Sequence, residues 1–510
     1  MESVFKPTLV LMSGRMVSLG ATLFIPVVLA RVLTVEEFGT YKQVFLIHMT
    51  LYAIAQFGMA ESLFYFLPRT SQRAGRYVLN SILLLLLAAS VCSGILLWEG
   101  ARVSDLLGNS RLAQYFPLLG MYLVFMTASA ALEIVMISRQ QYKRAAYSYA
   151  GSDVLRTVLL LSPALLLRSV QGLLVGAVVF ALCRFLVMVF YLRREFRNDL
   201  APDRPLLKQQ LSYALPFQCA IVIETIQANF HQYAVSHYFG AVTFAIYAIG
   251  CLQIPLVELF ASPAGNVMMV KMSGEIQNGR TDSAVEVWRE TTRKLSLLLF
   301  PLFGLALASA HEVIVLLFSA QYSASVPIFM VWSGTILLAT LQTDSALRVY
   351  AQTRLLAALN VLRLVVIVGL IYTFLSIFGL IGAVLLTLLA TCVYKALSLM
   401  RLRGLMGVRM TALLPWKSLS CVGGASALAL MSSMVAHALP GLSIISRLLV
   451  IGIIYMSVYG LLIFRLGILT SAEKLSIHRW TRNVLAIGGN AKTSHNRTKE
   501  EEQCVALSEY

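Results

Sequence analysis

The chain has 510 residues, of which 58% are hydrophobic and only 13% are charged. This composition excludes a soluble globular protein, because so many apolar helices would lack a polar shell. The net charge of +17 could suit nucleic acid, but the Lys and Arg residues lie between apolar stretches, so we expect no nucleic-acid partner.

Apolar stretches, each long enough to cross a bilayer, fill most of the first 467 residues. A transmembrane helix takes about 20 residues. In chain order, the fourteen predicted spans are 9–30, 43–67, 77–98, 115–138, 147–167, 172–192, 211–236, 242–263, 295–317, 325–347, 355–376, 379–400, 413–437 and 442–464. The sequence therefore predicts an all-α polytopic membrane protein with about 14 transmembrane helices.

The basic residues are distributed unevenly between the two sides of these spans. Of the 41 Lys and Arg, 30 fall on connections on the side of the N-terminus, including the C-terminal tail, and 6 fall on the opposite side. By the positive-inside rule both termini are expected in the cytoplasm. The seven Cys are scattered and no nucleotide-binding motif is present, so we expect neither a metal site nor a cofactor.

An internal repeat relates the two parts of the chain at an offset of about 206 residues. Its matched pairs are Phe38 and Phe244, Tyr41 and Tyr247, Arg156 and Arg363, Gly172 and Gly379, and Gly176 and Gly382. Because each unit has six spans, the two copies keep the same orientation in the membrane. We predict two six-helix lobes, 1–200 and 201–405, around a central cavity, then two more helices in 406–467 and a polar cytoplasmic tail, 468–510.

Several segments resemble the polysaccharide exporters of the multidrug, oligosaccharidyl-lipid and polysaccharide export superfamily, the Wzx-type flippases. They are VVLARVLTVEEFGTYKQVF (27–45), QFGMAESLFYFLPR (56–69), YALPFQCAIVIETIQANFHQYAVSHYFGAVTFAIYAI (213–249), LLFSAQYSASVPIFMVWS (316–333) and IFGLIGAVLLTLLAT (377–391). The resemblance covers roughly residues 5–400. It implies a transporter in the bacterial cytoplasmic membrane that flips undecaprenyl-diphosphate-linked oligosaccharide from the inner to the outer leaflet by alternating access.

Ionisable residues inside the spans are the candidates for the transport site, because each costs about 2.5 to 3.5 kcal/mol to insert. The repeat-related Arg156 and Arg363 would place two guanidinium groups across the lobe interface, where their planar donors match a diphosphate. The alternative is that Arg156 forms an ion pair with Asp153, three residues earlier on the helix, while Arg363 has a structural partner elsewhere. Arg15 in the first span is a further candidate, since related lipid II flippases also carry an arginine there. It could instead extend to the cytoplasmic interface.

Span 211–236 carries a polar stripe that suits ion coupling. Glu224, Gln227 and His231 share one helical face, and such groups could bind protons or sodium. They could equally bind sugar hydroxyls, or hydrogen-bond one another through Gln227. Asp344 and Arg348, four residues apart, are expected to form a local ion pair.

Two other functions compete with lipid-linked saccharide transport. A cation-coupled drug or small-molecule exporter of the same fold would be expected to bury carboxylates rather than paired arginines. A membrane polysaccharide polymerase or ligase would be expected to carry a sizeable outer loop, whereas the longest outer connection here, 99–114, is short. We therefore predict a transporter and not an enzyme.

Overall fold

A computed structural model describes residues 20, 24–70, 73–197 and 199–468, and throughout that part of the chain the secondary structure is helical. The helices before residue 200 are α2 (Val35–Ala55), α3 (Met59–Phe66), η1 (Leu67–Arg69), α4 (Ala74–Trp98), α5 (Gly100–Leu106), η2 (Ser110–Tyr115), α6 (Phe116–Ala128), α7 (Ala131–Ser138), α8 (Tyr142–Leu167) and α9 (Val170–Phe196). The all-α class predicted from the sequence is confirmed.

The remaining helices come in a similar order, and two further long helices, α19 and α21, follow them. They are α10 (Arg204–Gly250), α11 (Pro255–Gln277), α12 (Thr281–Ala308), α13 (Ala310–Phe318), η3 (Ala320–Ser325), α14 (Val326–Trp332), α15 (Gly334–Ala339), α16 (Thr343–Val349), α17 (Thr353–Met406), α18 (Met410–Leu413), α19 (Trp416–Ser433), α20 (Val435–Ala438) and α21 (Ile444–Arg465). The short helices η2 and η3 occupy matching places in the two units. Pro117 and Pro327 lie in the first turn of the helices that follow them, α6 and α14.

The described residues hold nine helices long and apolar enough to cross a membrane, or up to eleven when each of two bent pairs is counted as one span. The predicted count of fourteen is compatible with this number. Most of the first predicted span, 9–30, lies outside the described residues, and the 54-residue α17 covers two predicted spans. Its backbone breaks at Gly379, where φ is 58°. Glycine tolerates this left-handed conformation, so α17 is kinked there and its two parts cover the two predicted spans.

Local backbone geometry supports the internal repeat. Gln140 and Ala351, which occupy matching places in it, both have a left-handed φ, of 59° and 53°. Each is followed by a glutamine that hydrogen-bonds to a later helix of its own unit: Gln141 to Glu195, and Gln352 to Arg401. A non-glycine residue seldom adopts such a φ, so its recurrence at matched positions indicates that the two units turn in the same way.

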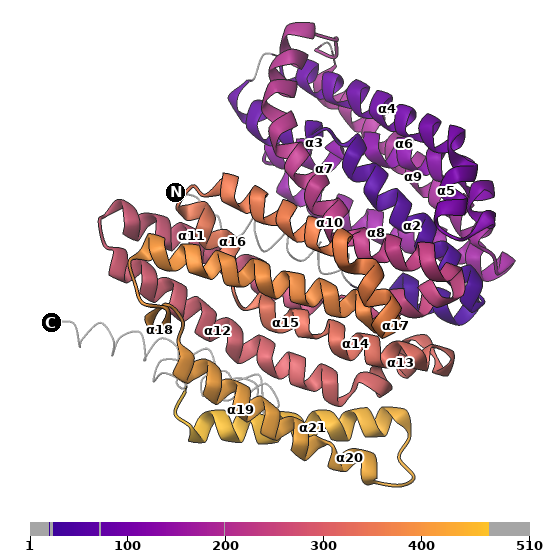
Figure 1. The fold of residues 1–510 in the computed structure, drawn as a ribbon. Coiled ribbons are helices and arrows are strands. Elements are labelled where there is room, and N and C mark those ends of the chain that lie inside the picture. Colours follow the sequence, from indigo (N-terminus) through magenta and orange to yellow (C-terminus); the bar gives the residue numbers. More distant parts are fainter. Residues whose placement is uncertain (1–19, 21–23, 71–72, 198, 469–510) are drawn as a thin grey trace, which may run out of the picture.

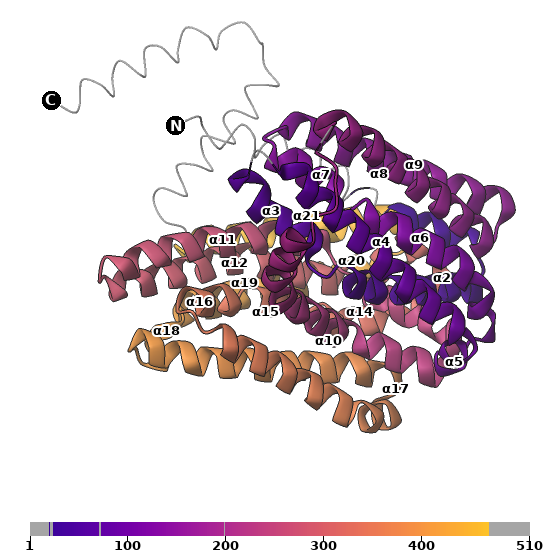
Figure 2. The ribbon, with the colours of Figure 1, turned by 90° about the horizontal axis from the view of Figure 1, so that it is seen from above.

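The helices before α10 and those after it gather in two groups (Figure 1). Helix α10 contacts α2, α3 and α4 of the first group and α14 and α17 of the second. Seen from above, α17 lies along one side and α8 and α9 along the opposite side (Figure 2). The boundaries 1–200, 201–405, 406–467 and 468–510 stay predictions.

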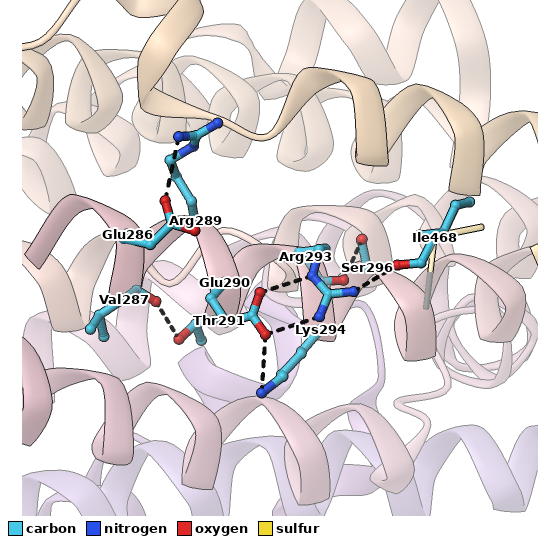
Figure 3. Close-up of polar contacts among 9 residues, drawn as sticks. All are labelled: Glu286, Val287, Arg289, Glu290, Thr291, Arg293, Lys294, Ser296 and Ile468. Atoms are coloured by element: carbon cyan, nitrogen blue, oxygen red, sulfur yellow. Dashed lines mark hydrogen bonds and ion pairs between the residues drawn. The ribbon is translucent and has the colours of Figure 1, made fainter. Parts of the chain in front are cut away.

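The C-terminal helices α19 and α21 pack against α12. Ser426 of α19 donates to the carbonyl of Phe300 at 3.0 Å and shares a 2.7 Å hydrogen bond with Tyr455 of α21. Seven residues before Phe300 in α12, Arg293 binds Glu290 through two 2.9 Å hydrogen bonds and donates to the Ile468 carbonyl at 3.1 Å (Figure 3). These bonds join the middle of α19 and the residues just after α21 to α12.

Candidate functional site

Arg156 lies in α8 with its side chain partly buried. Its Nε is buried and has no hydrogen-bond partner among the described residues. Tyr41 and His48 of α2 lie within electrostatic reach of the guanidinium. The alternative ion pair with Asp153 is not formed, and in the described part of the chain Arg156 pairs with no carboxylate.

Aromatic rings surround His48 on the α2 side of this site. Its imidazole lies 4.6 Å from the Tyr122 ring and 5.7 Å from the Tyr52 ring, centroid to centroid. Phe45 completes the group at 6.1 Å. These rings lie around His48, which is within electrostatic reach of Arg156, and among the described residues no carboxylate forms an ion pair with Arg156.

Arg363 lies in α17 and has closer polar neighbours. With the Gln227 amide oriented so that its oxygen faces the guanidinium, Nε and Nη2 of Arg363 donate to it at 3.0 and 3.3 Å. The Tyr394 ring centroid is 5.9 Å away, and Glu224 and Asp344 lie within electrostatic reach. Arg363 and Gln227 of the predicted stripe thus lie in contact in the second unit.

His231 is fully buried on α10. Its Nδ1 lies 2.6 Å from the Tyr247 hydroxyl, its ring lies 5.4 Å from that of Trp332, and its Nε2 has no partner among the described residues. Glu224 is exposed. The alternative in which Gln227 bridges the stripe is wrong, because Gln227 binds Arg363 and His231 binds Tyr247.

The predicted Asp344–Arg348 ion pair is also wrong. Asp344 instead lies 3.5 Å from the Lys395 ammonium, and its other oxygen accepts a 2.8 Å hydrogen bond from the Tyr394 hydroxyl. Both partners come from α17, about fifty residues later. Sequence reasoning missed Lys395, although its position inside the predicted span 379–400 was a signal.

A buried ion pair joins Glu133 of α7 to Arg184 of α9. Glu133 is 2% exposed, Ser148 donates to it at 2.8 Å, and Arg184 donates to Ser152 at 2.8 Å. Glu133 and Asp344 lie at matching places, each seven residues before the left-handed residue described above. Each unit therefore pairs one carboxylate with a cation from its last long helix.

The remaining candidate, Arg15, lies outside the described residues. A central cavity around the candidates stays an expectation. Among the candidates within the described spans, Arg156 and Arg363 have no ion pair with a carboxylate, whereas Glu133 and Asp344 are each paired with a cation.

Comparisons with known proteins agree with this architecture. A family model described as polysaccharide biosynthesis protein matches residues 28–327, more than half of the chain. A search of curated proteins gave no match.

Three solved structures share the fold. The lipid II flippase MurJ, in an inward closed conformation, is 12% identical with a TM-score of 0.68, and the match covers 91% of this chain and 99% of that one. A multidrug resistance MATE family transporter of the MOP superfamily is 15% identical with a TM-score of 0.56, covering 77% and 94%. A MOP superfamily transporter from Pyrococcus furiosus is 15% identical with a TM-score of 0.54, covering 78% and 94%.

At these identities the likeness establishes the fold alone. The three structures are a flippase and two transporters. The resemblance seen in the sequence segments is confirmed: the chain is a multi-pass membrane protein that belongs to the polysaccharide biosynthesis protein family and has the fold of the multidrug, oligosaccharidyl-lipid and polysaccharide export superfamily.

Proposed function

We propose that this protein flips undecaprenyl-diphosphate-linked oligosaccharide from the inner to the outer leaflet by alternating access. Membership of a polysaccharide biosynthesis family supports a saccharide as the transported group. The likeness to a lipid II flippase supports a lipid carrier attached to it. The bacterial cytoplasmic membrane, with both termini in the cytoplasm, is the location that this function requires.

The observation that carries the proposal is the contrast among arginines within the spans. Arg184 is neutralised by Glu133, whereas Arg156 and Arg363 pair with no carboxylate in the described part of the chain. An unpaired charge in a span costs about 2.5 to 3.5 kcal/mol, which a ligand of opposite charge can offset. A lipid diphosphate has that charge and accepts hydrogen bonds from a planar guanidinium. Arg15 is a third candidate ligand for it.

The test replaces each arginine and follows the lipid-linked saccharide. Arg156→Ala and Arg363→Ala should leave the protein level in the membrane unchanged. Outer-leaflet delivery should fall about 10- to 100-fold, the equivalent of one lost charge-assisted contact of about 1.5 to 3 kcal/mol. Arg348→Ala is the matched control, because Arg348 is exposed and lies outside the site. Normal glycan display in the double variant would reject the assignment.

Ion coupling is the second part of the proposal. We assign it to Glu224 and His231, because they flank Gln227 on α10, whose oxygen accepts from Arg363, and because a carboxylate and an imidazole can bind a proton or a sodium ion. The direct measurement is saccharide transport in sealed vesicles. Transport that is unchanged when both the proton and the sodium gradient are collapsed would remove these two residues from the mechanism.

A cation-coupled drug or small-molecule exporter is the second candidate function, and exposed Glu224 favours it because a carboxylate suits a cationic substrate. The two functions are distinguished by Glu224→Gln. An exporter would lose drug resistance in this variant with glycan display unaffected. A saccharide flippase would show no change in drug susceptibility.

A further inference from the structure

The ammonium group of Lys395 is held by three oxygen atoms inside the second unit. Nζ lies 3.0 Å from the carbonyl oxygen of Leu341, 3.0 Å from the hydroxyl of Thr343 and 3.5 Å from a carboxylate oxygen of Asp344. A lysine ammonium has three donors, so this set matches its capacity. The Lys395 side chain is only 14% exposed.

These oxygens come from a short break between two helices. Helix α15 ends at Ala339 and α16 begins at Thr343, which leaves residues 340–342 outside regular helix within an apolar span. Irregular backbone is tolerated at membrane depth only where its polar groups are satisfied. In transporters, unwound carbonyl groups next to half-helices coordinate monovalent cations.

The geometry differs from that of a simple buried ion pair. The ammonium lies closer to two neutral oxygens than to the carboxylate of Asp344, whose other oxygen is held by Tyr394 and Thr343. A carbonyl, a hydroxyl and an oriented carboxylate are the hard oxygen ligands of a metal cation. Beyond this set, Arg363 of α17 is the charged group within electrostatic reach of Lys395 among the described residues, and Glu224 of α10 is within reach of Arg363.

The first unit neutralises its matching carboxylate with a different cation. Its matching carboxylate, Glu133, is neutralised by Arg184 from α9, the helix that corresponds to the second half of α17. Under the repeat, Lys395 corresponds to Met188, one helical turn beyond Arg184. Both units thus supply a tethered cation to the same carboxylate position from different turns of the last helix.

We propose that Leu341, Thr343 and Asp344 form a monovalent cation site whose cation is supplied by the chain itself, as the ammonium of Lys395. The site goes beyond the proposed function, because it concerns a cation and not the transported lipid. While the Lys395 ammonium occupies it, the site needs no free sodium or potassium ion. Removing the amino group should convert it into a site for a free alkali cation, and the Asp344 side chain, 44% exposed, leaves a route for the ion.

The experiment measures thermal unfolding of the purified full chain in detergent, in potassium chloride against choline chloride at equal ionic strength. Lys395→Ala opens the site, whereas Lys395→Met fills the same space without charge. We expect the alanine variant to gain about 2 °C or more in apparent Tm from potassium chloride. The wild type, Lys395→Met and the double variant Lys395→Ala/Asp344→Asn should gain nothing.

An alanine variant that stays monodisperse and unfolds at the same temperature in both salts would overturn the proposal. Equal gains in Lys395→Met would overturn it as well. If Lys395→Ala aggregates in choline chloride, recovery by potassium chloride supports the site, and aggregation in both salts overturns it. No lipid substrate is present in this assay, so its failure would leave the proposed transport function standing.

Discussion

Removing Arg184 should destabilise the protein strongly, because it leaves the buried carboxylate of Glu133 without its counter-charge. Glu133 is 2% exposed, and of its bonds to described residues it would keep the one from Ser148. Breaking a buried ion pair by deleting one partner costs about 3 to 5 kcal/mol. The insertion cost of one charge in a span, about 2.5 to 3.5 kcal/mol, gives a similar figure. We therefore expect Arg184→Leu to lose about 3 kcal/mol of unfolding free energy.

The assay is reversible unfolding of the purified protein in mixed micelles, with the free energy extrapolated to native conditions. Glu133→Gln/Arg184→Leu is the matched control, since it removes both charges and keeps similar volumes. We expect the double variant to be more stable than Arg184→Leu alone and to lie within about 1.5 kcal/mol of the wild type.

Two outcomes would refute this reasoning. Arg184→Leu within about 0.5 kcal/mol of the wild type would show that Glu133 is not a buried charge in the membrane. A double variant as unstable as Arg184→Leu would show that the loss comes from packing around Arg184, and not from the uncompensated carboxylate.

Two smaller predictions concern packing and acid stability. Gly382→Val should lower the apparent Tm by several degrees, because a Cβ there would lie 2.1 Å from the Phe374 carbonyl oxygen, whereas Gly369→Val, with open space around it, should not. Asp203 caps α10 outside the spans, and the Leu206 N–H, helped by an arginine on α4, lowers its pKa. Its stabilising effect is therefore present at neutral pH and lost as pH falls through that lowered pKa. Asp203→Ala should flatten the acid side of the stability–pH profile, and an unchanged profile would contradict this.

The long helices were predictable from the sequence, because runs of about 20 apolar residues fall where the structure has them, as the predicted span 77–98 does in α4. The break within α17 was not predictable in the same way. Gly379 was matched to Gly172 by sequence, yet α17 breaks at Gly379 whereas Gly172 lies within α9. The sequence also matched Gln140 to Ala351, but their shared left-handed φ appears only in the structure.

The side-chain contacts between helices were not predictable from the spacing of residues along one helix. Helical spacing indicated that Asp344 would meet Arg348, but the break before α16 sets the orientation of Asp344 toward Lys395 on α17. The stripe on α10 shared a face as expected, yet its members bind residues of other helices, such as Gln227 with Arg363. Tertiary packing determines these partners, and the periodic pattern of one helix carries no information about which helices pack against it.

The two arginines differ in how many donors they have left for an anion. Two nitrogens of Arg363 are engaged by the Gln227 oxygen, and Glu224 and Asp344 lie within electrostatic reach without forming an ion pair with it. Arg156 keeps an Nε without a partner among the described residues. A diphosphate should gain more from the arginine whose donors are free, because the other must first give up existing bonds.

Arg156→Ala should therefore reduce outer-leaflet delivery more than Arg363→Ala. Gln227→Leu should partly offset the difference, since it releases the Arg363 guanidinium for the anion. Delivery by the three variants is compared at equal protein levels in the same membrane. An equal or larger loss in Arg363→Ala would mean that the Gln227 contact orients Arg363 for the substrate instead of competing with it, and in that case Gln227→Leu would lower delivery as well.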